Sequence, residues 1–292
     1  MTSDMAGNSV RIWTDEEFEA EYERRRLLDD AEADRLAEVA ESLDADGPDA
    51  LAARLGYLRF LQETYENDEV LELAEPLIAD SARILGPDHP TTIAARALQA
   101  MTLVVEGGPE AAHAADTLAN LVNEQLRAAG PDDPDTLWLR RRHAWHARYQ
   151  AQTSAPDAYD AGLRDRALQL WADVVAEHVR VLGPDHPDTL AARDEQTEDF
   201  CELSEHDLEV AGYAALAADR ARILGPDHPE TLRSRERHAS SLGETGRAED
   251  LAEGARLYDA IVADYVRVLG PESWEAQEAM SMRATWFVDD DD

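Results

Sequence analysis

The chain has 292 residues, with 27 basic and 63 acidic side chains and a formal net charge of −36. This charge argues against non-specific attraction to nucleic acid or to anionic membranes, and it favours solubility and basic partners. Every basic residue is an arginine, which excludes chemistry that needs a lysine, such as Schiff-base formation or phosphate binding by a P-loop.

The N-terminal region is strongly acidic. We expect residues 1–13 to be disordered and residues 14–46 to form an acidic capping hairpin, because Thr14 and Glu17 make a capping box and apolar residues around Leu36 follow at helical spacing. We interpret the acidity of this hairpin as a solvated outer face. Residues 1–20 have no apolar run of the secretion-signal type, and the sequence has no apolar stretch of about eighteen residues.

From Gly47 onward the chain repeats one pattern, which is clearest over 222–232. Gly225 and Pro226 stop a helix there, because glycine accepts a left-handed backbone and proline cannot continue the helix. Asp227 is predicted to cap the next helix, with Glu230 completing a capping box. The pattern therefore predicts a tight turn between two helices.

Copies of this turn recur about every forty residues, a period that fits a pair of helices with its turns. Such repeats bury their core between neighbours, so we expect one continuous repeat region over 47–288, followed by an acidic tail over 289–292. The turn glycines are Gly47, Gly86, Gly130, Gly183, Gly225 and Gly270.

Superposing the copies predicts the core. Nine residues before each turn glycine an apolar side chain recurs, and twelve before it the last three copies have an aromatic ring that would fill the space between helices. The following helices have their own apolar row. These predicted core positions are Leu77, Leu121, Val174, Leu216 and Ile261, then Trp171, Tyr213 and Tyr258, then Leu51, Ile93, Leu137, Leu190 and Leu232.

Two rows of arginine also recur. One lies three residues before the glycine, where a cation favours the carbonyl end of a helix. The other lies ten residues after it, and we expect its members to pair with acids of the adjacent hairpin. The rows are Arg83, Arg127, Arg180, Arg222 and Arg267, and Arg96, Arg140, Arg193 and Arg235.

The run Leu224-Gly225-Pro226-Asp227-His228-Pro229, with Thr231, Leu232 and Arg235, resembles the long tetratricopeptide repeats of kinesin light chain type, especially the actinobacterial versions. The resemblance covers roughly 47–288. It implies an all-α, right-handed solenoid whose first helices line a concave groove that binds peptides or partner proteins.

The sequence departs from the family pattern twice. The repeat from Gly130 to Gly183 has extra length around 149–165, which predicts either a longer hairpin or an exposed loop. At the other end, the turn at Gly270 is followed by a single helix containing Trp274 and Met280, which we expect to cover the end of the stack.

Catalytic and metal-binding patterns are weak. The turn histidines His89, His186 and His228 lie on separate hairpins, about forty residues or more apart. The pair His143 and His146 has no further ligands at metal-binding spacing. Cys201, the only cysteine, has no nucleophile signature around it and gives no disulfide framework. We therefore predict a cytoplasmic protein that is not an enzyme, with no cofactor, no metal and no direct contact with nucleic acid or membrane.

The predicted function is a scaffold that binds a protein or peptide, and local clusters of arginine in this acidic chain suggest that the bound segment is acidic. Arginine suits this task because its planar fork meets a carboxylate with two hydrogen bonds. Pairing of these arginines with neighbouring acids, or with the acidic ends of the chain itself, is the other interpretation. The predicted groove residues are Arg141, Arg142, His146, Arg148, Arg233 and Arg237.

A different class of function also fits the composition. An acid-rich surface resembles nucleic acid in charge, so the chain could act as a decoy that occupies a basic nucleic-acid-binding protein. A decoy needs its acids in a continuous stripe, whereas a peptide-binding protein needs a distinct groove lining.

Overall fold

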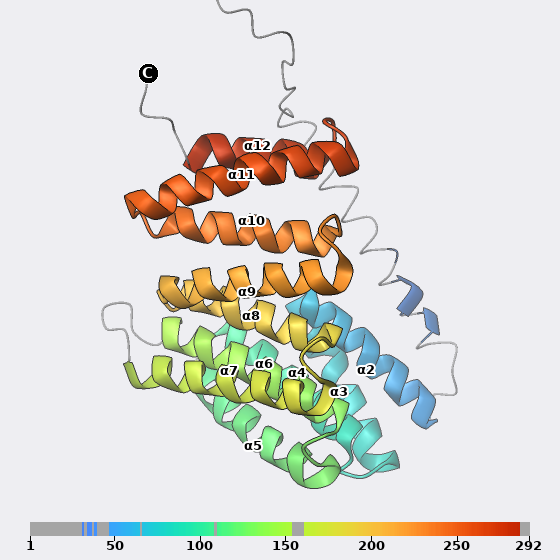
Figure 1. The fold of residues 1–292 in the computed structure, drawn as a ribbon. Coiled ribbons are helices and arrows are strands. Elements are labelled where there is room, and N and C mark those ends of the chain that lie inside the picture. The colour runs from blue at the N-terminus through green and yellow to red at the C-terminus, as the bar shows by residue number, and fades with distance from the viewer. Residues whose placement is uncertain are drawn as a thin grey trace, which may run out of the picture. The chain divides into compact units, whose positions relative to one another are not determined.

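The computed structural model describes residues 47–64, 66–107, 110–153 and 161–286, together with 31, 34–36, 38 and 39. All regular structure within these residues is α-helical (Figure 1). The predicted disordered N-terminus (1–13), most of the capping hairpin (14–46) and the acidic tail (289–292) lie outside the described residues. The prediction of an all-α stack of helical hairpins is confirmed.

The described residues fall into two compact units whose boundary lies inside one helix, between Ala192 and Arg193. The first unit contains three helical pairs in chain order and the start of the next helix. Its helices are α2 (Pro48–Glu63), α3 (Asn67–Ile84), α4 (Pro90–Glu106), α5 (Ala111–Ala129), α6 (Pro134–Thr153), α7 (Ala161–Leu182) and the beginning of α8 (Pro187–Glu202).

The second unit contains the rest of α8 and four further helices. Figure 1 shows α10, α11 and α12 packed as successive layers, in orange to red. The last helix, α12, packs against α11 and α10, as predicted for a helix that ends the stack. The further helices are α9 (His206–Leu224), α10 (Pro229–Glu244), α11 (Ala248–Leu269) and α12 (Trp274–Trp286).

The predicted core rows are buried in both units. Leu77, Leu121 and Ile261 have no exposed surface, and the rings of Trp171 and Tyr258 are equally enclosed. In the second unit Tyr258 and Ile261 pack with Leu232 and with two alanines of α12. Small residues on α12 let that helix approach the aromatic row closely, which explains how a single helix can cover the end of the unit.

The repeated turn uses its residues differently from the prediction. Gly225 has φ 97° and ψ 159°, a conformation essentially restricted to glycine, so the expected positive φ is confirmed. The predicted Asp227 cap is wrong: Nδ1 of His228 accepts the hydrogen bond from the Glu230 amide at 3.2 Å. Asp227 instead pairs with Arg267 at 2.6 Å, which ties this turn to the next one.

The second arginine row forms a ladder, although its partners differ from those expected. Arg96 pairs with Glu124 at 2.9 Å and Arg235 with Asp264 at 2.7 Å. In each case the acid lies on the second helix of the same pair rather than on an adjacent hairpin. The ladder therefore joins the two helices of a pair, and it does so again at Arg54 with Asp80, Arg140 with Glu177 and Arg193 with Asp219.

The extra length near 149–165 goes at least partly into helix. Helix α6 continues to Thr153 and α7 begins at Ala161, while residues 154–160 lie outside the described part. None of the described helices is both long enough and apolar enough to span a membrane.

Candidate functional site

The first candidate surface is helix α6, which carries four of the six predicted groove residues. Pro134 occupies its first turn, and the Asp133 carboxylate accepts the amide hydrogen of Thr136 at 3.0 Å. Of the α6 side chains that the structure describes, only Pro134 is exposed. An enclosed helix that contains three consecutive arginines must place charge in partly buried positions, where electrostatic interactions are stronger than at the surface.

His146 is the most enclosed polar group of this helix, with 2% of its surface exposed. Neither ring nitrogen has a hydrogen-bond partner. Burial, together with the nearby charge of Arg142, lowers the pKa of His146 to about 3. The ring is therefore neutral near pH 7, with one donor and one acceptor that are both unsatisfied, which is a costly arrangement in a protein interior.

Aromatic rings surround His146 and Arg148. The Trp145 ring meets His146 edge-on at 4.8 Å between centroids and stacks with Tyr149 at 5.9 Å. The Arg148 guanidinium lies over the Trp145 ring at 4.8 Å, a cation–π contact. Three predicted residues, Arg142, His146 and Arg148, are thus brought together with two aromatic rings that were not predicted.

Arg141 faces a different part of the same unit. It lines a pocket of about 320 Å³ between α6, α7 and the turn residues that follow them. Trp138 and Leu137 form apolar walls, and the buried His178 closes the α7 side. This pocket combines an apolar interior with a few polar groups, as is typical of ligand-binding pockets.

The two remaining predicted residues lie on α10, in the other unit. Arg233 is exposed and pairs with Glu230 at 3.4 Å on its own helix. Arg237 is half-buried, lies 3.1 Å from Asp194 and donates to the Tyr213 hydroxyl at 3.4 Å. For these two arginines the geometry matches pairing with neighbouring acids.

Asp194 is the centre of a charge cluster formed by three helices. It belongs to α8 and accepts from Arg220 of α9 at 2.8 Å and from Arg237 of α10 at 3.1 Å. Arg220 is 5% exposed and also donates to Ser234 at 2.5 Å. Sequence analysis did not find Arg220, because it lies outside both arginine rows.

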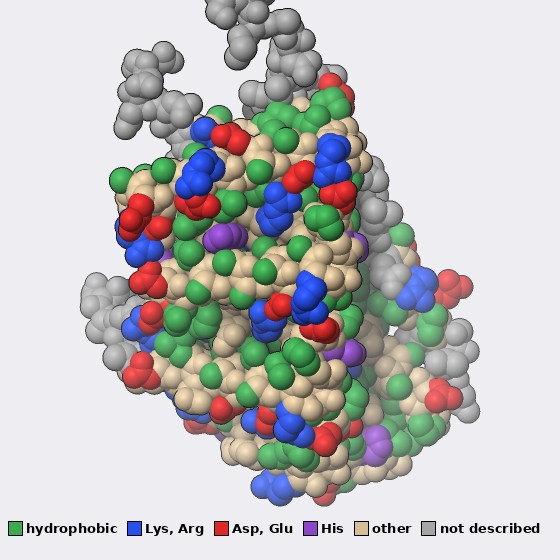
Figure 2. Space-filling model, viewed as in Figure 1, with side chains coloured by type: hydrophobic (Ala, Val, Ile, Leu, Met, Phe, Trp, Pro, Cys, Tyr) green, Lys and Arg blue, Asp and Glu red, His purple; other side chains and the backbone are tan. Residues whose placement is uncertain are grey.

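Acidic and basic side chains are interleaved on the visible surface (Figure 2). The arrangement follows the ion pairs between repeats and within helices, such as Arg180 with Asp132 at 2.7 Å and Arg222 with Asp219 at 3.1 Å. On this face red side chains do not form a continuous stripe of the kind that a nucleic-acid decoy needs.

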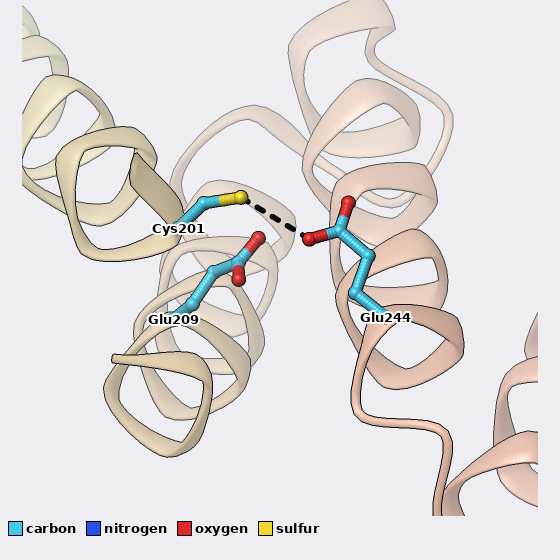
Figure 3. A group of neighbouring side chains, drawn as sticks. All are labelled: Cys201, Glu209 and Glu244. Carbon is cyan, nitrogen blue, oxygen red and sulfur yellow. Dashed lines mark hydrogen bonds between the residues drawn. The ribbon is translucent and has the colours of Figure 1, made fainter. Parts of the chain in front are cut away.

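The second candidate site is a group of potential metal ligands on α8, α9 and α10, at the opposite end of these helices from the Asp194 cluster. Cys201, Glu209 and Glu244 each provide a ligand atom, and these atoms lie within 4.8 Å of one another. Figure 3 shows the thiol and both carboxylates pointing toward a common space. The Cys201 thiol donates to Glu244 at 3.1 Å, and Glu209 lies 3.4 Å from Nδ1 of His206.

The ionisation of this group is perturbed by its surroundings. Glu209 is 4% exposed, and burial raises its pKa, as does the charge of Glu244. Burial likewise raises the pKa of the Cys201 thiol, and the hydrogen bond to Glu244 acts in the same direction. Near neutral pH the group therefore favours the thiol form of Cys201 and disfavours two carboxylate charges side by side.

Sequence analysis missed this group for a physical reason. Its members come from three helices and have no motif spacing, so only the fold brings them together. A weak signal existed, since Cys201 and Glu244 both lie at the C-terminal ends of first helices and Glu209 lies in the first turn of α9.

Comparison with known proteins supports the repeat assignment. A family model for the tetratricopeptide repeat matches residues 157–188. No curated protein matches the chain. A crystal structure from Podosopora anserina, described as a kinesin light chain with nearly identical TPR-like repeats, is 23% identical, with a TM-score of 0.58 over 74% of this chain and 95% of that one.

Two further structures have the same fold. A single-residue variant of the Podosopora anserina protein is 21% identical, with a TM-score of 0.59 over 75% of this chain and 96% of that one. BtubC (BKLC) from P. vanneervenii is 12% identical, with a TM-score of 0.57 over 82% of this chain and 91% of that one. The resemblance to kinesin-light-chain-like tetratricopeptide repeats is confirmed, and at these identities the likeness concerns the fold.

Proposed function

Because the chain is built from tetratricopeptide-type helical pairs, we propose that it is a non-catalytic scaffold that binds an acidic peptide segment of a partner protein. Repeats of this type are typical of protein–protein interaction. The proposed contact surface is helix α6 with the pocket beside it, within the unit Glu23–Ala192.

The observation that carries the proposal is the pocket in which Arg141 and Trp138 meet. A volume of about 320 Å³ can hold one or two side chains of a bound peptide. A partner glutamate could place its methylene groups against Trp138 and its carboxylate against the Arg141 guanidinium. Aromatic and arginine side chains are also the residues that contribute most binding energy at protein interfaces.

His146, Arg142 and Arg148 would extend this surface along α6. A partner hydrogen bond to either His146 nitrogen would satisfy a buried group that has no partner in the free protein. The charges of Arg142 and Arg148 favour an acidic segment over a neutral or basic one.

The experiment is a fluorescence-polarisation titration of the full chain with a labelled glutamate-rich peptide and a matched peptide in which every glutamate is glutamine. We expect the glutamate peptide to bind at least about tenfold more tightly and its affinity to fall as salt is added. Arg141→Ala should weaken binding about tenfold or more, the loss typical of an interface arginine.

The matched control is Arg256→Ala, which removes an exposed arginine that pairs with Glu253 on the second helix α11. This variant should bind like the wild type. Equal binding of both peptides, or binding that ignores Arg141→Ala, would reject the α6 surface. Tight binding of an arginine-rich peptide that is insensitive to Arg141→Ala would instead favour the decoy function.

A further inference from the structure

Glu209 is a buried carboxylate that forms no ion pair with an arginine of the described part of the chain. Two other enclosed acids of this chain have one: Glu177 pairs with Arg140 and Asp194 with Arg220. Within the described part of the chain, neither Glu209 nor Glu244 forms an ion pair with an arginine, and Nδ1 of His206 lies 3.4 Å from the Glu209 carboxylate. The nearby Arg247 is engaged with Asp207 and Asp250.

A buried acid beside a second acid is stabilised by a positive charge close to both carboxylates. A proton can supply it, and so can a metal ion. The choice depends on the other donors, and here a thiol and an imidazole accompany the two carboxylates. This is a mixed set of sulfur, nitrogen and oxygen ligands, contributed by α8, α9 and α10.

We propose that Cys201, Glu209, Glu244 and His206 form a binding site for Zn²⁺. Zn²⁺ is a borderline-soft ion that accepts thiolate, imidazole and carboxylate ligands in one tetrahedral shell. Harder ions such as Mg²⁺ and Ca²⁺ prefer all-oxygen sites, so the thiol makes them poorer candidates.

The existing geometry needs only a small contraction. With ligand bonds of about 2.0–2.3 Å, neighbouring ligand atoms of a tetrahedral zinc site lie about 3.3–3.8 Å apart. The Cys201 sulfur is already 3.1 Å from Glu244, the His206 nitrogen is 3.4 Å from Glu209, and the three atoms of Cys201, Glu209 and Glu244 span at most 4.8 Å.

Access from solvent is also available. Glu209 is buried, but His206 is partly exposed and lines a surface pocket of about 260 Å³ together with Thr245, the residue after Glu244. An ion can therefore reach the ligands from the side of the helix ends. On binding, the Cys201 sulfur must lose its proton to solvent, as must Glu209 wherever it is protonated, so uptake of the ion is coupled to proton release.

The test uses the full chain after treatment with a chelator and removal of the chelator. Co²⁺ is titrated first, because a cobalt–thiolate bond gives a charge-transfer absorption band in the near ultraviolet. The chain has one cysteine, so such a band can only come from Cys201. We expect the band to appear with wild type, to saturate at one ion per chain, and to vanish when Zn²⁺ is added in competition.

Variants identify the ligands. Cys201→Ser should abolish the band, and Glu209→Gln should weaken Zn²⁺ binding about tenfold or more in calorimetry. The control is His186→Gln, which removes a partly exposed histidine that lies 3.8 Å from Asp188 and should leave binding unchanged. Circular dichroism confirms that each variant folds, and Glu209→Gln removes a buried charge, so its fold is not expected to suffer.

Several results would overturn the site. The absence of a thiolate band with folded wild type would show that a proton alone balances the two acids. Zn²⁺ binding that survives both Cys201→Ser and Glu209→Gln would place the ion elsewhere. A zinc-dependent dimer in size-exclusion chromatography would mean that Cys201 ligates an ion shared between two chains instead of this four-ligand site.

Discussion

Helices α8, α9 and α10 hold two partly buried clusters, each with an enclosed acid, and the two acids have different neighbours. Toward one end, Asp194 lies between two arginines, Arg220 and Arg237. Toward the other end, Glu209 faces a second acid, Glu244, and a thiol. Both acids are enclosed, yet only Asp194 has its countercharge within the protein.

The difference teaches where to look for an external ligand in an acid-rich repeat protein. A carboxylate that is held by arginines is part of the architecture, since removing either partner leaves a buried charge without compensation. A carboxylate that faces another carboxylate has no countercharge from the protein, so a proton or a cation close to both stabilises it. In a chain with a formal net charge of −36, acids are abundant everywhere. The presence or absence of a neighbouring arginine therefore distinguishes a structural carboxylate from one that could bind an external cation.

The largest expected effect comes from breaking the Asp194 cluster. Asp194→Ala removes the closest carboxylate of Arg220, which is 5% exposed, and leaves it only the more distant carboxylate of Glu230 at 3.8 Å. We expect the free energy of unfolding to fall by about 3–5 kcal/mol, which is typical of breaking one side of a buried ion pair. Urea denaturation followed by circular dichroism measures the loss.

Asp219→Ala is the matched control. Its carboxylate pairs with Arg193 and Arg222 but is more exposed, so the loss should stay below about 1 kcal/mol. Equal losses for the two variants would contradict the distinction between the Asp194 cluster and ordinary ladder pairs.

Glu236 tests the same rule by titration. It lies on α10, accepts a hydrogen bond from the Tyr265 hydroxyl at 3.0 Å and has Arg233, Arg237 and Glu278 as charged neighbours. Burial raises the pKa of Glu236 from 4.5 to about 7, and the Tyr265 hydrogen bond only partly opposes this. The folded state therefore binds a proton that the unfolded state has already lost between about pH 4.5 and about pH 7.

The direction of the pH dependence of stability follows from this extra proton in the folded state. Stability contributed by Glu236 is fully present below about pH 4.5 and is lost as the pH rises through about 7, a change of at most about 3 kcal/mol. Melting temperatures of wild type and Glu236→Gln, measured across this range, should converge at acidic pH and separate above it, with the variant the more stable. A constant difference between them at all pH values would contradict the raised pKa.

Glu209→Gln should act in the opposite direction to Asp194→Ala. In the metal-free protein it removes one of two adjacent acids, so we expect a gain of about 1 kcal/mol in the free energy of unfolding at pH 7. The same variant loses the proposed stabilisation by Zn²⁺. A substantial loss of stability without metal would show that the Glu209 charge is already compensated, and the contrast with Asp194 would fail.

The repeated features of this chain could be predicted from sequence, because each copy of the repeat places the same kind of residue at the same position. The core positions Leu77, Trp171 and Ile261 follow from apolar periodicity alone. The capping residue was predicted wrongly by one position: Asp227 and His228 are both plausible caps, but the backbone places His228 at the N-cap of its helix, as it places His89 in an earlier copy.

The sites could be predicted only in part, since a site depends on contacts between elements. The run around Arg142 and His146 is visible in the sequence because it lies on one helix, although the stacked rings of Trp145 and Tyr149 emerge only from the fold. The cluster of Cys201 and Glu209 has no motif spacing, and its only sequence signal is the position of its members near helix ends. Non-repeated contacts between helices are therefore where the structure adds most.

The smallest predicted effect concerns the backbone that separates the two ligands Cys201 and Glu209. Ser204, in the turn between α8 and α9, has φ 59° and is the only described residue other than glycine with a positive φ. A left-handed conformation costs a side chain about 1–2 kcal/mol, and the greater freedom of glycine in the unfolded chain takes back about half of any gain. Ser204→Gly should therefore stabilise the metal-free protein by about 0.5–1 kcal/mol, whereas Ser204→Ala, which keeps the strain, should not.

Because neither change alters a ligand, thiolate-band titrations should give the same cobalt affinity for both variants. A loss of affinity in Ser204→Gly alone would show that the rigid turn itself holds Cys201 and Glu209 in register, and the contrast with the Asp194 cluster would then include backbone strain as well as charge.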